Sequence, residues 1–138
     1  MSRIAAFLRL ALFLALAGIV GFGTNAIARE YDRYGDATIM VAIADLPPEA
    51  RQTVHLIRQG GPFPFPHKDG STFGNFENRL PSQTRGYYRE YTVPTPGRHD
   101  RGARRIIAGE GRSGNVATSG EYYYSDDHYR SFRRIREP

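Results

Sequence analysis

Residues 45–61, which read DLPPEARQTVHLIRQGG, have the pattern of an amphipathic helix. Asp45 is a candidate N-cap, and prolines are tolerated in the first turn of a helix. Apolar residues at i, i+4 and i+7 form one stripe along this helix: Ala50, Val54 and Ile57, with Leu56 beside it. Gly60 and Gly61 then end it. The segment is the only long helix predicted after residue 28.

Short strands are predicted on both sides of this helix. Residues 38–44 (TIMVAIA) predict a short buried strand, and residues 62–82, with four of the nine prolines, predict mostly loop. Four further runs have strand character: residues 87–93, 104–108, 121–124 and 131–135. Residues 109–120, with four glycines, predict a flexible connection. One helix followed by several strands predicts a single α+β domain, with the helix packed on one face of an antiparallel sheet.

The first 28 residues have the pattern of a secretory signal peptide. Arg3 gives a positive start, residues 10–22 are apolar or glycine, and Ala26-Ile27-Ala28 is a small-x-small cleavage signal. The alternative is an uncleaved anchor over residues 4–22. Arg9 interrupts that run, and the clean apolar part is shorter than the ~20 residues that a membrane span needs. We therefore expect cleavage after Ala28, a domain over residues 29–138, and an extracellular or periplasmic protein without stable membrane association.

The composition limits the kinds of site that the chain can form. The chain has no cysteine, so neither a disulfide nor a Cys-based metal site can form, and its four histidines lack ligand spacing. We expect no metal and no cofactor. Without Arg3 and Arg9, 17 Lys and Arg residues stand against 14 Asp and Glu. Arginines crowd into residues 98–105 and 130–136, and their planar donor forks suit phosphate. For the second cluster, a solvated basic face is the alternative interpretation.

A carboxylate and two arginines are candidates for a shared site. Side chains alternate along a strand, so Glu90 shares one face with Tyr88 and Thr92. Arg101 and Arg105 are four residues apart, and a hairpin at residues 95–97 can fold them against Glu90. His128 follows two acidic residues near the last predicted strand and is the candidate acid. Each feature alone is common on protein surfaces, since strand glutamates usually face solvent and lone histidines are usually structural.

Several longer motifs resemble a known family. The matching segments occur in this order: Leu46–Ala50, Gly61–Pro64, Leu80–Pro81, Gly86–Val93, Pro96–Gly97, Arg101–Ile107 and Asp127–Tyr129. They resemble the microbial guanyl-specific ribonucleases, the barnase-like group, and most closely the small streptomycete-type guanyl ribonucleases. The resemblance covers nearly all of residues 40–136. It implies the microbial ribonuclease fold and a metal-independent endoribonuclease that cleaves single-stranded RNA through a 2′,3′-cyclic phosphate.

The resemblance also implies roles for individual residues. Glu90 matches the general base and His128 the general acid, while Arg101 and Arg105 match the two phosphate-binding arginines. Tyr129 matches the aromatic residue of the phosphate site. The guanine-binding loop matches residues 73–77: Phe73, Gly74, Asn75, Phe76 and Glu77. Glu77 would accept from guanine N1–H and the exocyclic amine, because guanine alone presents two adjacent donors on that edge. A monomer and a barstar-like protein inhibitor are further implications.

Three departures from the family are visible in the sequence. Phe76 stands where the family usually has Arg, which removes one positive charge beside the base. Ala42 stands at the first position of the disulfide of the streptomycete-type enzymes, a loss that typically costs roughly 2–5 kcal/mol. The connection at residues 110–120 is longer and richer in glycine than in the family.

Two other classes of function compete with the enzyme. The first is a secreted RNA-binding or toxin-like protein with an impaired site. The presence of the base, the acid and both arginines argues against this class, because a degenerate site would be expected to lose one of them. The second is a cationic membrane-active protein that acts through the Arg-rich tail. In the tail Phe132 and Ile135 are not spaced as in a long amphipathic helix, which disfavours the membrane hypothesis.

Overall fold

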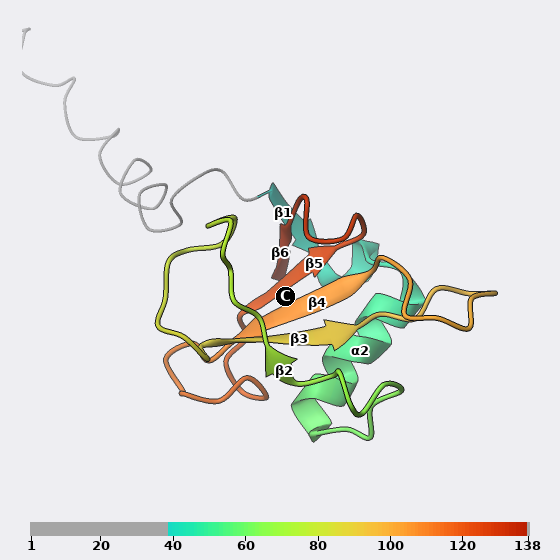
Figure 1. Cartoon of the computed structure of the whole chain (residues 1–138), viewed down its shortest axis with the longest axis horizontal. Coiled ribbons are helices and arrows are strands. Elements are labelled where there is room, and N and C mark those ends of the chain that lie inside the picture. Colours follow the sequence, from blue (N-terminus) through green and yellow to red (C-terminus); the bar gives the residue numbers. More distant parts are fainter. Residues whose placement is uncertain (1–38, 138) are drawn as a thin grey trace, which may run out of the picture. The chain divides into compact units, whose positions relative to one another are not determined.

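The structure is a computed structural model in which residues 39–137 are described. The predicted signal peptide lies outside them, as does Thr38. The elements follow in this order (Figure 1): β1 (Ile39–Ala42), η1 (Ile43–Asp45, a 3-10 helix), α2 (Pro48–Gln59), β2 (Ser71–Thr72), β3 (Tyr88–Thr92), β4 (Arg105–Gly109), β5 (Tyr122–Ser125) and β6 (Arg133–Arg136). Within residues 39–137, neither helix is long and apolar enough to cross a membrane.

The helix α2 forms where the stripe predicts it, but it begins later. Pro47 is the N-cap, without a side-chain hydrogen bond, and Asp45 lies in η1, so the predicted cap was wrong. Proline suits the first helical position because its missing N–H would have no partner in that turn. Gly60 ends the helix at φ 79°, a left-handed conformation that costs glycine little. The predicted stripe of Ala50, Val54 and Ile57 is fully buried.

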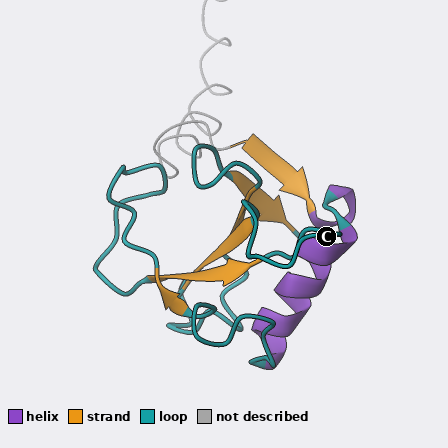
Figure 2. Cartoon of the chain, turned by 45° about the vertical axis from the view of Figure 1, so that its right-hand side comes forward, coloured by secondary structure: helices purple, strands orange, loops and turns teal. Residues whose placement is uncertain are grey.

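The six strands within residues 39–137 form one sheet in the order β1-β6-β5-β4-β3-β2 (Figure 1). Each pair is antiparallel except β1 with β6, which run parallel with Ile39 opposite Arg133. The sheet is therefore mixed, and the predicted antiparallel sheet was wrong at this edge. The helix packs on one face of it (Figure 2), on a core that includes Tyr91, Ile106, Ala108, Tyr122, Tyr124 and Ile135. The predicted α+β class is confirmed.

The two outer strands differ from the expectations. Residues 38–44 were expected to be buried, but Ile39 and Met40 are 69% and 51% exposed because β1 is an edge strand. The opposite edge, β2, lies inside the predicted loop and pairs with β3, Ser71 facing Glu90. Two residues are too few to leave a periodic pattern in the sequence.

The connection between β4 and β5 was expected to be flexible, and it is a set of turns with several anchors. The Asn115 N–H donates to the Glu110 carbonyl at 3.1 Å. The buried Tyr122 donates its hydroxyl to the Val116 carbonyl at 2.8 Å, and Val116 packs against the core. The connection leaves β4 at Gly109, the end of the strand away from residues 94–104.

Candidate active site

The candidate site lies on the face of the sheet opposite α2. Alternation along β3 turns Tyr91 toward the helix and Glu90 and Thr92 to the other face. Thr92 is paired with Arg105 of β4, and Ser71 of β2 is paired with Glu90. Three neighbouring strands thus place a carboxylate, two hydroxyls and a guanidinium within one patch.

Glu90 is held by donors from three segments. Tyr129 donates its hydroxyl to Oε2, and Ser71 donates to Oε1 at 3.2 Å. Arg101 Nη2 lies 3.6 Å from Oε1, and the Glu90 side chain is 16% exposed. Burial first, and then the hydrogen bond to Glu90 and its charge, raise the pKa of Tyr129, which favours the protonated hydroxyl as donor. The carboxylate is thereby fixed in position and remains reachable from solvent.

Arg105 is the most buried cation of the patch, with 4% of its surface exposed. Its Nη1 donates to the carbonyls of Arg101, Gly102 and Arg104 at 3.2, 3.0 and 2.7 Å. Its Nε donates to the Tyr129 hydroxyl at 3.0 Å. The guanidinium therefore organises the loop before β4 and fixes Tyr129, while Nη2 takes part in none of these bonds.

Arg101 has an unused donor inside the site. Its Nε donates to the Thr92 hydroxyl at 2.9 Å, which fixes the side chain. Its Nη2 is buried and has no hydrogen-bond partner among the described residues. Such a donor is costly to bury unless a ligand supplies the acceptor. An oxyanion between Arg101 and Arg105 would satisfy it.

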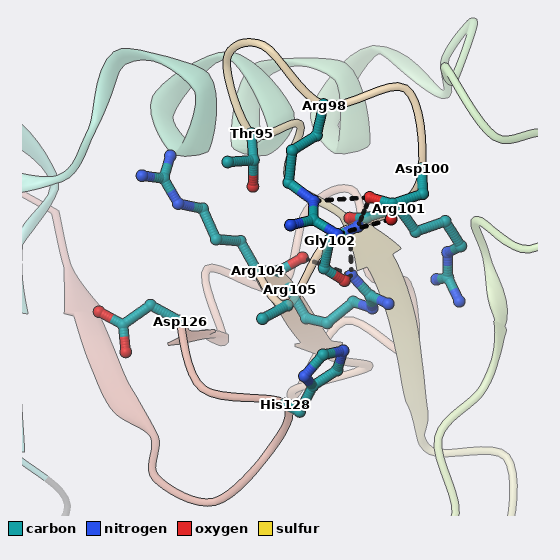
Figure 3. A pocket seen from close by; sticks show the side chains of 10 residues that line it. Thr95, Arg98, Asp100, Arg101, Gly102, Arg104, Arg105, Asp126 and His128 are labelled. Atoms are coloured by element: carbon teal, nitrogen blue, oxygen red, sulfur yellow. Dashed lines mark hydrogen bonds and ion pairs between the residues drawn. The ribbon is translucent and has the colours of Figure 1, made fainter.

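His128 borders this patch from a tight turn after β5 (Figure 3). His128 and Tyr129 have φ values of 56° and 67°, both in the left-handed region that non-glycine residues rarely adopt. The His128 N–H donates to the Ala103 carbonyl at 3.2 Å, which ties the turn to the loop before β4. The imidazole is exposed and lines a cavity together with Arg101 and Arg105.

Asp127 holds the strained turn in place. Its Oδ1 accepts from the N–H groups of Arg130 and Ser131 and from the Ser125 hydroxyl, all at 3.0 Å. Ser125 in turn accepts the Tyr129 N–H. Burial alone would raise the pKa of Asp127, but the hydrogen bonds from Ser131, Ser125 and Arg130 lower it. Of the two acids that precede His128, Asp127 binds the turn, and Asp126 pairs with Arg133.

Asp127→Asn is expected to destabilise the fold at neutral pH and much less in acid. A carboxyl with a lowered pKa in the folded state stabilises the fold above its unfolded pKa of about 3.9, and this contribution is lost as the pH falls through the lowered value. Urea unfolding at several pH values should therefore show that the difference in free energy of unfolding between wild type and variant shrinks below about pH 4. Asp126→Asn is the neighbouring control, and a gap independent of pH would contradict the linkage.

The loop expected to bind guanine, residues 73–77, lies next to Tyr129. Phe73 packs against that tyrosine with ring centroids 5.2 Å apart. The Asn75 side chain is occupied in shaping the loop, because it donates to the Leu80 carbonyl at 2.9 Å and accepts the Leu80 N–H at 3.0 Å. Phe76 is 95% exposed. Glu77 is exposed too, and its carboxylate accepts from Arg79 Nε at 2.6 Å.

Most of the predicted site residues are therefore neighbours. Glu90, Arg101, Arg105 and Tyr129 form one bonded cluster, and His128 borders it. Sequence reasoning missed the residues that position this cluster: Ser71, Thr92, Ser125 and Asp127. For Thr92 the sequence did hold a signal, because alternation along the strand places it on the same face as Glu90. For Ser71 it held none, because Ser71 reaches Glu90 from strand β2, which was not predicted.

Comparison with known proteins identifies the class of this chain. The sequence model of a family described as ribonuclease matches residues 29–136. The chain therefore belongs to the ribonuclease family and is an enzyme.

The names of similar proteins are narrower than the description of the family. The chain is 54% identical over 93 residues to guanyl-specific ribonuclease St of Saccharopolyspora erythraea, covering 67% of this chain and 83% of the relative. It is 50% identical over 100 residues to guanyl-specific ribonuclease Sa of Kitasatospora aureofaciens, covering 72% and 96%. A solved structure of ribonuclease Sa2 complexed with mononucleotides superimposes with a TM-score of 0.64 at 42% identity, covering 73% of this chain and 96% of that one. The expected family and fold are confirmed.

Proposed function

We propose that this chain is an exported, guanyl-preferring endoribonuclease that cleaves single-stranded RNA without a metal ion. The observation that carries the proposal is the buried Nη2 of Arg101, which makes no hydrogen bond within residues 39–137 and lies 3.6 Å from Glu90 Oε1 as an ion pair, in the same cluster as Arg105. A phosphate oxygen would satisfy that donor beside a carboxylate. The guanyl-specific relatives support the base preference.

The chemistry follows from the placement of these groups. Glu90 removes the proton from the ribose 2′-OH, and the 2′-oxygen attacks the adjacent phosphorus. Arg101 and Arg105 stabilise the charge on the non-bridging oxygens. The bond from phosphorus to the 5′-oxygen breaks, and His128 gives that oxygen a proton. The product is a 2′,3′-cyclic phosphate, which water opens to a 3′-phosphate as the two residues exchange roles.

Guanine recognition is assigned to the loop at residues 73–77. Glu77 would accept from both adjacent donors of guanine, and other bases would leave part of the carboxylate unpaired. Arg79 Nε donates to Glu77 Oε2, which orients the carboxylate and leaves it acceptor positions for the base. Phe76, almost wholly exposed, is free to stack on a base. The Asn75 side chain contributes by shaping the loop, because its amide is bonded to the Leu80 backbone.

Export and partners complete the proposal. The charged, apolar and small-residue order of residues 1–28 supports secretion or a periplasmic location. The arginine-rich surface around the cluster suits an acidic protein inhibitor of the barstar type, and we expect the enzyme to act as a monomer.

Base preference is the test of this proposal. Residues 29–138, in EDTA, are expected to cleave a dinucleotide with G on the 5′ side of the scissile phosphate at least about a hundredfold faster than those with A, C or U, because a wrong base leaves the Glu77 carboxylate without its donors. Chromatography would follow release of guanosine 2′,3′-cyclic phosphate. Glu77→Gln should collapse the preference, and Glu110→Gln should leave it intact. Equal rates for all four bases would remove the guanine site but leave the catalytic assignment.

A further inference from the structure

Strand β2 carries a hydroxyl to the Glu90 carboxylate, and the proposed cleavage step gives this hydroxyl no role. β2 lies beside β3 at the edge of the sheet (Figure 1), where Ser71 is paired with Glu90. The Gly70 N–H also donates to the Glu90 carbonyl at 2.8 Å. The backbone therefore holds Ser71 beside the carboxylate, although the residue is exposed.

The Ser71 hydroxyl has two acceptors for its one proton. Its Oγ lies 2.7 Å from the Lys68 carbonyl oxygen and 3.2 Å from Glu90 Oε1. A hydroxyl has one donor and two acceptor lone pairs, so it can donate to one partner while it accepts from another. With its proton on the Lys68 carbonyl, Ser71 can accept a hydrogen bond from a protonated Glu90.

The two carboxylate oxygens of Glu90 differ in this respect. Oε2 accepts from the Tyr129 hydroxyl, which in turn accepts from Arg105 Nε at 3.0 Å. Among the hydrogen bonds of residues 39–137 this phenol donates only to Glu90, so Oε2 stays an acceptor. Arg101 Nη2 lies 3.6 Å from Oε1 and makes no hydrogen bond to it. Oε1 is therefore the oxygen that is free to take up a proton.

We propose that Ser71 is a positioning residue for Glu90 that serves both of its protonation states. The hydroxyl donates to Oε1 while Glu90 is a carboxylate. It accepts from Oε1 when Glu90 is a carboxylic acid, because its own proton then turns to the Lys68 carbonyl. The inference rests on the proposed function, since only a residue that acts first as a base and then as an acid needs a partner of this kind.

Each step of the proposed reaction starts from one of these states. In transphosphorylation the proton of the 2′-OH passes to Oε1 as the 2′-oxygen bonds to phosphorus, while His128 protonates the departing 5′-oxygen. In hydrolysis His128 takes a proton from the attacking water, and Oε1 returns its proton to the 2′-oxygen as that oxygen leaves phosphorus. Ser71 keeps Oε1 in the same position at the start of both steps.

Ser71→Ala tests the two steps separately, with GpC as the substrate for transphosphorylation and guanosine 2′,3′-cyclic phosphate as the substrate for hydrolysis. We expect kcat to fall about fivefold in each step, the size of one hydrogen bond between uncharged or singly charged groups. KM should change by less than about twofold, because Ser71 bonds to Glu90 and to neither arginine of the cluster. Ser71→Thr keeps the hydroxyl and suits a strand, so it should restore most of the rate in both steps.

Thr72→Val is the matched control, since it removes the neighbouring hydroxyl of β2, which accepts from Arg89 Nη1 at 3.2 Å, and should keep wild-type rates. A loss confined to transphosphorylation would show that Ser71 only donates to the carboxylate, and it would overturn the dual role. A rise in KM without a fall in kcat would overturn it too. If wild type is active and Ser71→Ala matches it in both steps, only the role of Ser71 fails; if wild type turns over neither substrate, the proposed function fails and this role with it.

Discussion

Glu90→Gln is expected to lower kcat/KM for GpC by about a thousandfold or more, in the upper range for loss of a general base. The amide has the shape of the carboxylate: its oxygen can still accept from Tyr129, and its NH2 group can donate to the Ser71 hydroxyl, so the cluster can keep its arrangement. It cannot take a proton from the 2′-OH. Initial rates of cyclic phosphate release would measure the loss.

Two measurements separate this effect from misfolding. The thermal unfolding midpoint and the affinity for 3′-GMP should change little in Glu90→Gln. Glu110→Gln, which removes a carboxylate next to β4 but outside the cluster, should keep full activity. Activity within about tenfold of wild type in Glu90→Gln would assign the base to another residue.

His128→Asn should show a loss that depends on the leaving group. With GpC we expect kcat/KM to fall about a thousandfold, because the 5′-oxygen must be protonated as it departs. With guanosine 3′-(4-nitrophenyl phosphate) the fall should be under about tenfold, since nitrophenolate leaves without a proton. Asn is chosen because it tolerates the φ of 56° at this position better than most residues.

The two catalytic variants control for each other in this experiment. Glu90→Gln should be inactive on both substrates, because the 2′-OH must lose its proton in each. His67→Asn, which changes an exposed histidine in the loop before β2, should resemble wild type. Equal losses on the two substrates in His128→Asn would show that His128 positions the phosphate and does not supply the proton.

Local patterns in the sequence predicted the parts of the fold that depend on local physics. The stripe on α2 and the alternation along β3 each require only that apolar side chains face the core, and both are confirmed. The parallel pairing of β1 with β6 joins segments more than ninety residues apart, and no local pattern encodes it. The same is true of β2, which exists because β3 offers a free edge.

In the candidate site, too, the features set by local patterns were predictable and those set by irregular loops were not. Alternation placed Glu90 and Thr92 on one face, and the hairpin brought Arg105 beside them. The support of His128 by Asp127 was not predictable, because a left-handed turn carries no clear signal when it lacks glycine. The Glu77–Arg79 pair was also missed, since it depends on how an irregular loop folds back.

The pairing of β1 with β6 also makes the candidate site depend on strand insertion. The strand β6 lies between β1 and β5, and the turn with His128 and Tyr129 comes just before it. Without β6 in place, β5 has no neighbour on that side, and the turn that holds Tyr129 against Glu90 has no frame. The candidate site therefore forms only together with the completed sheet, and a partly folded chain does not carry it.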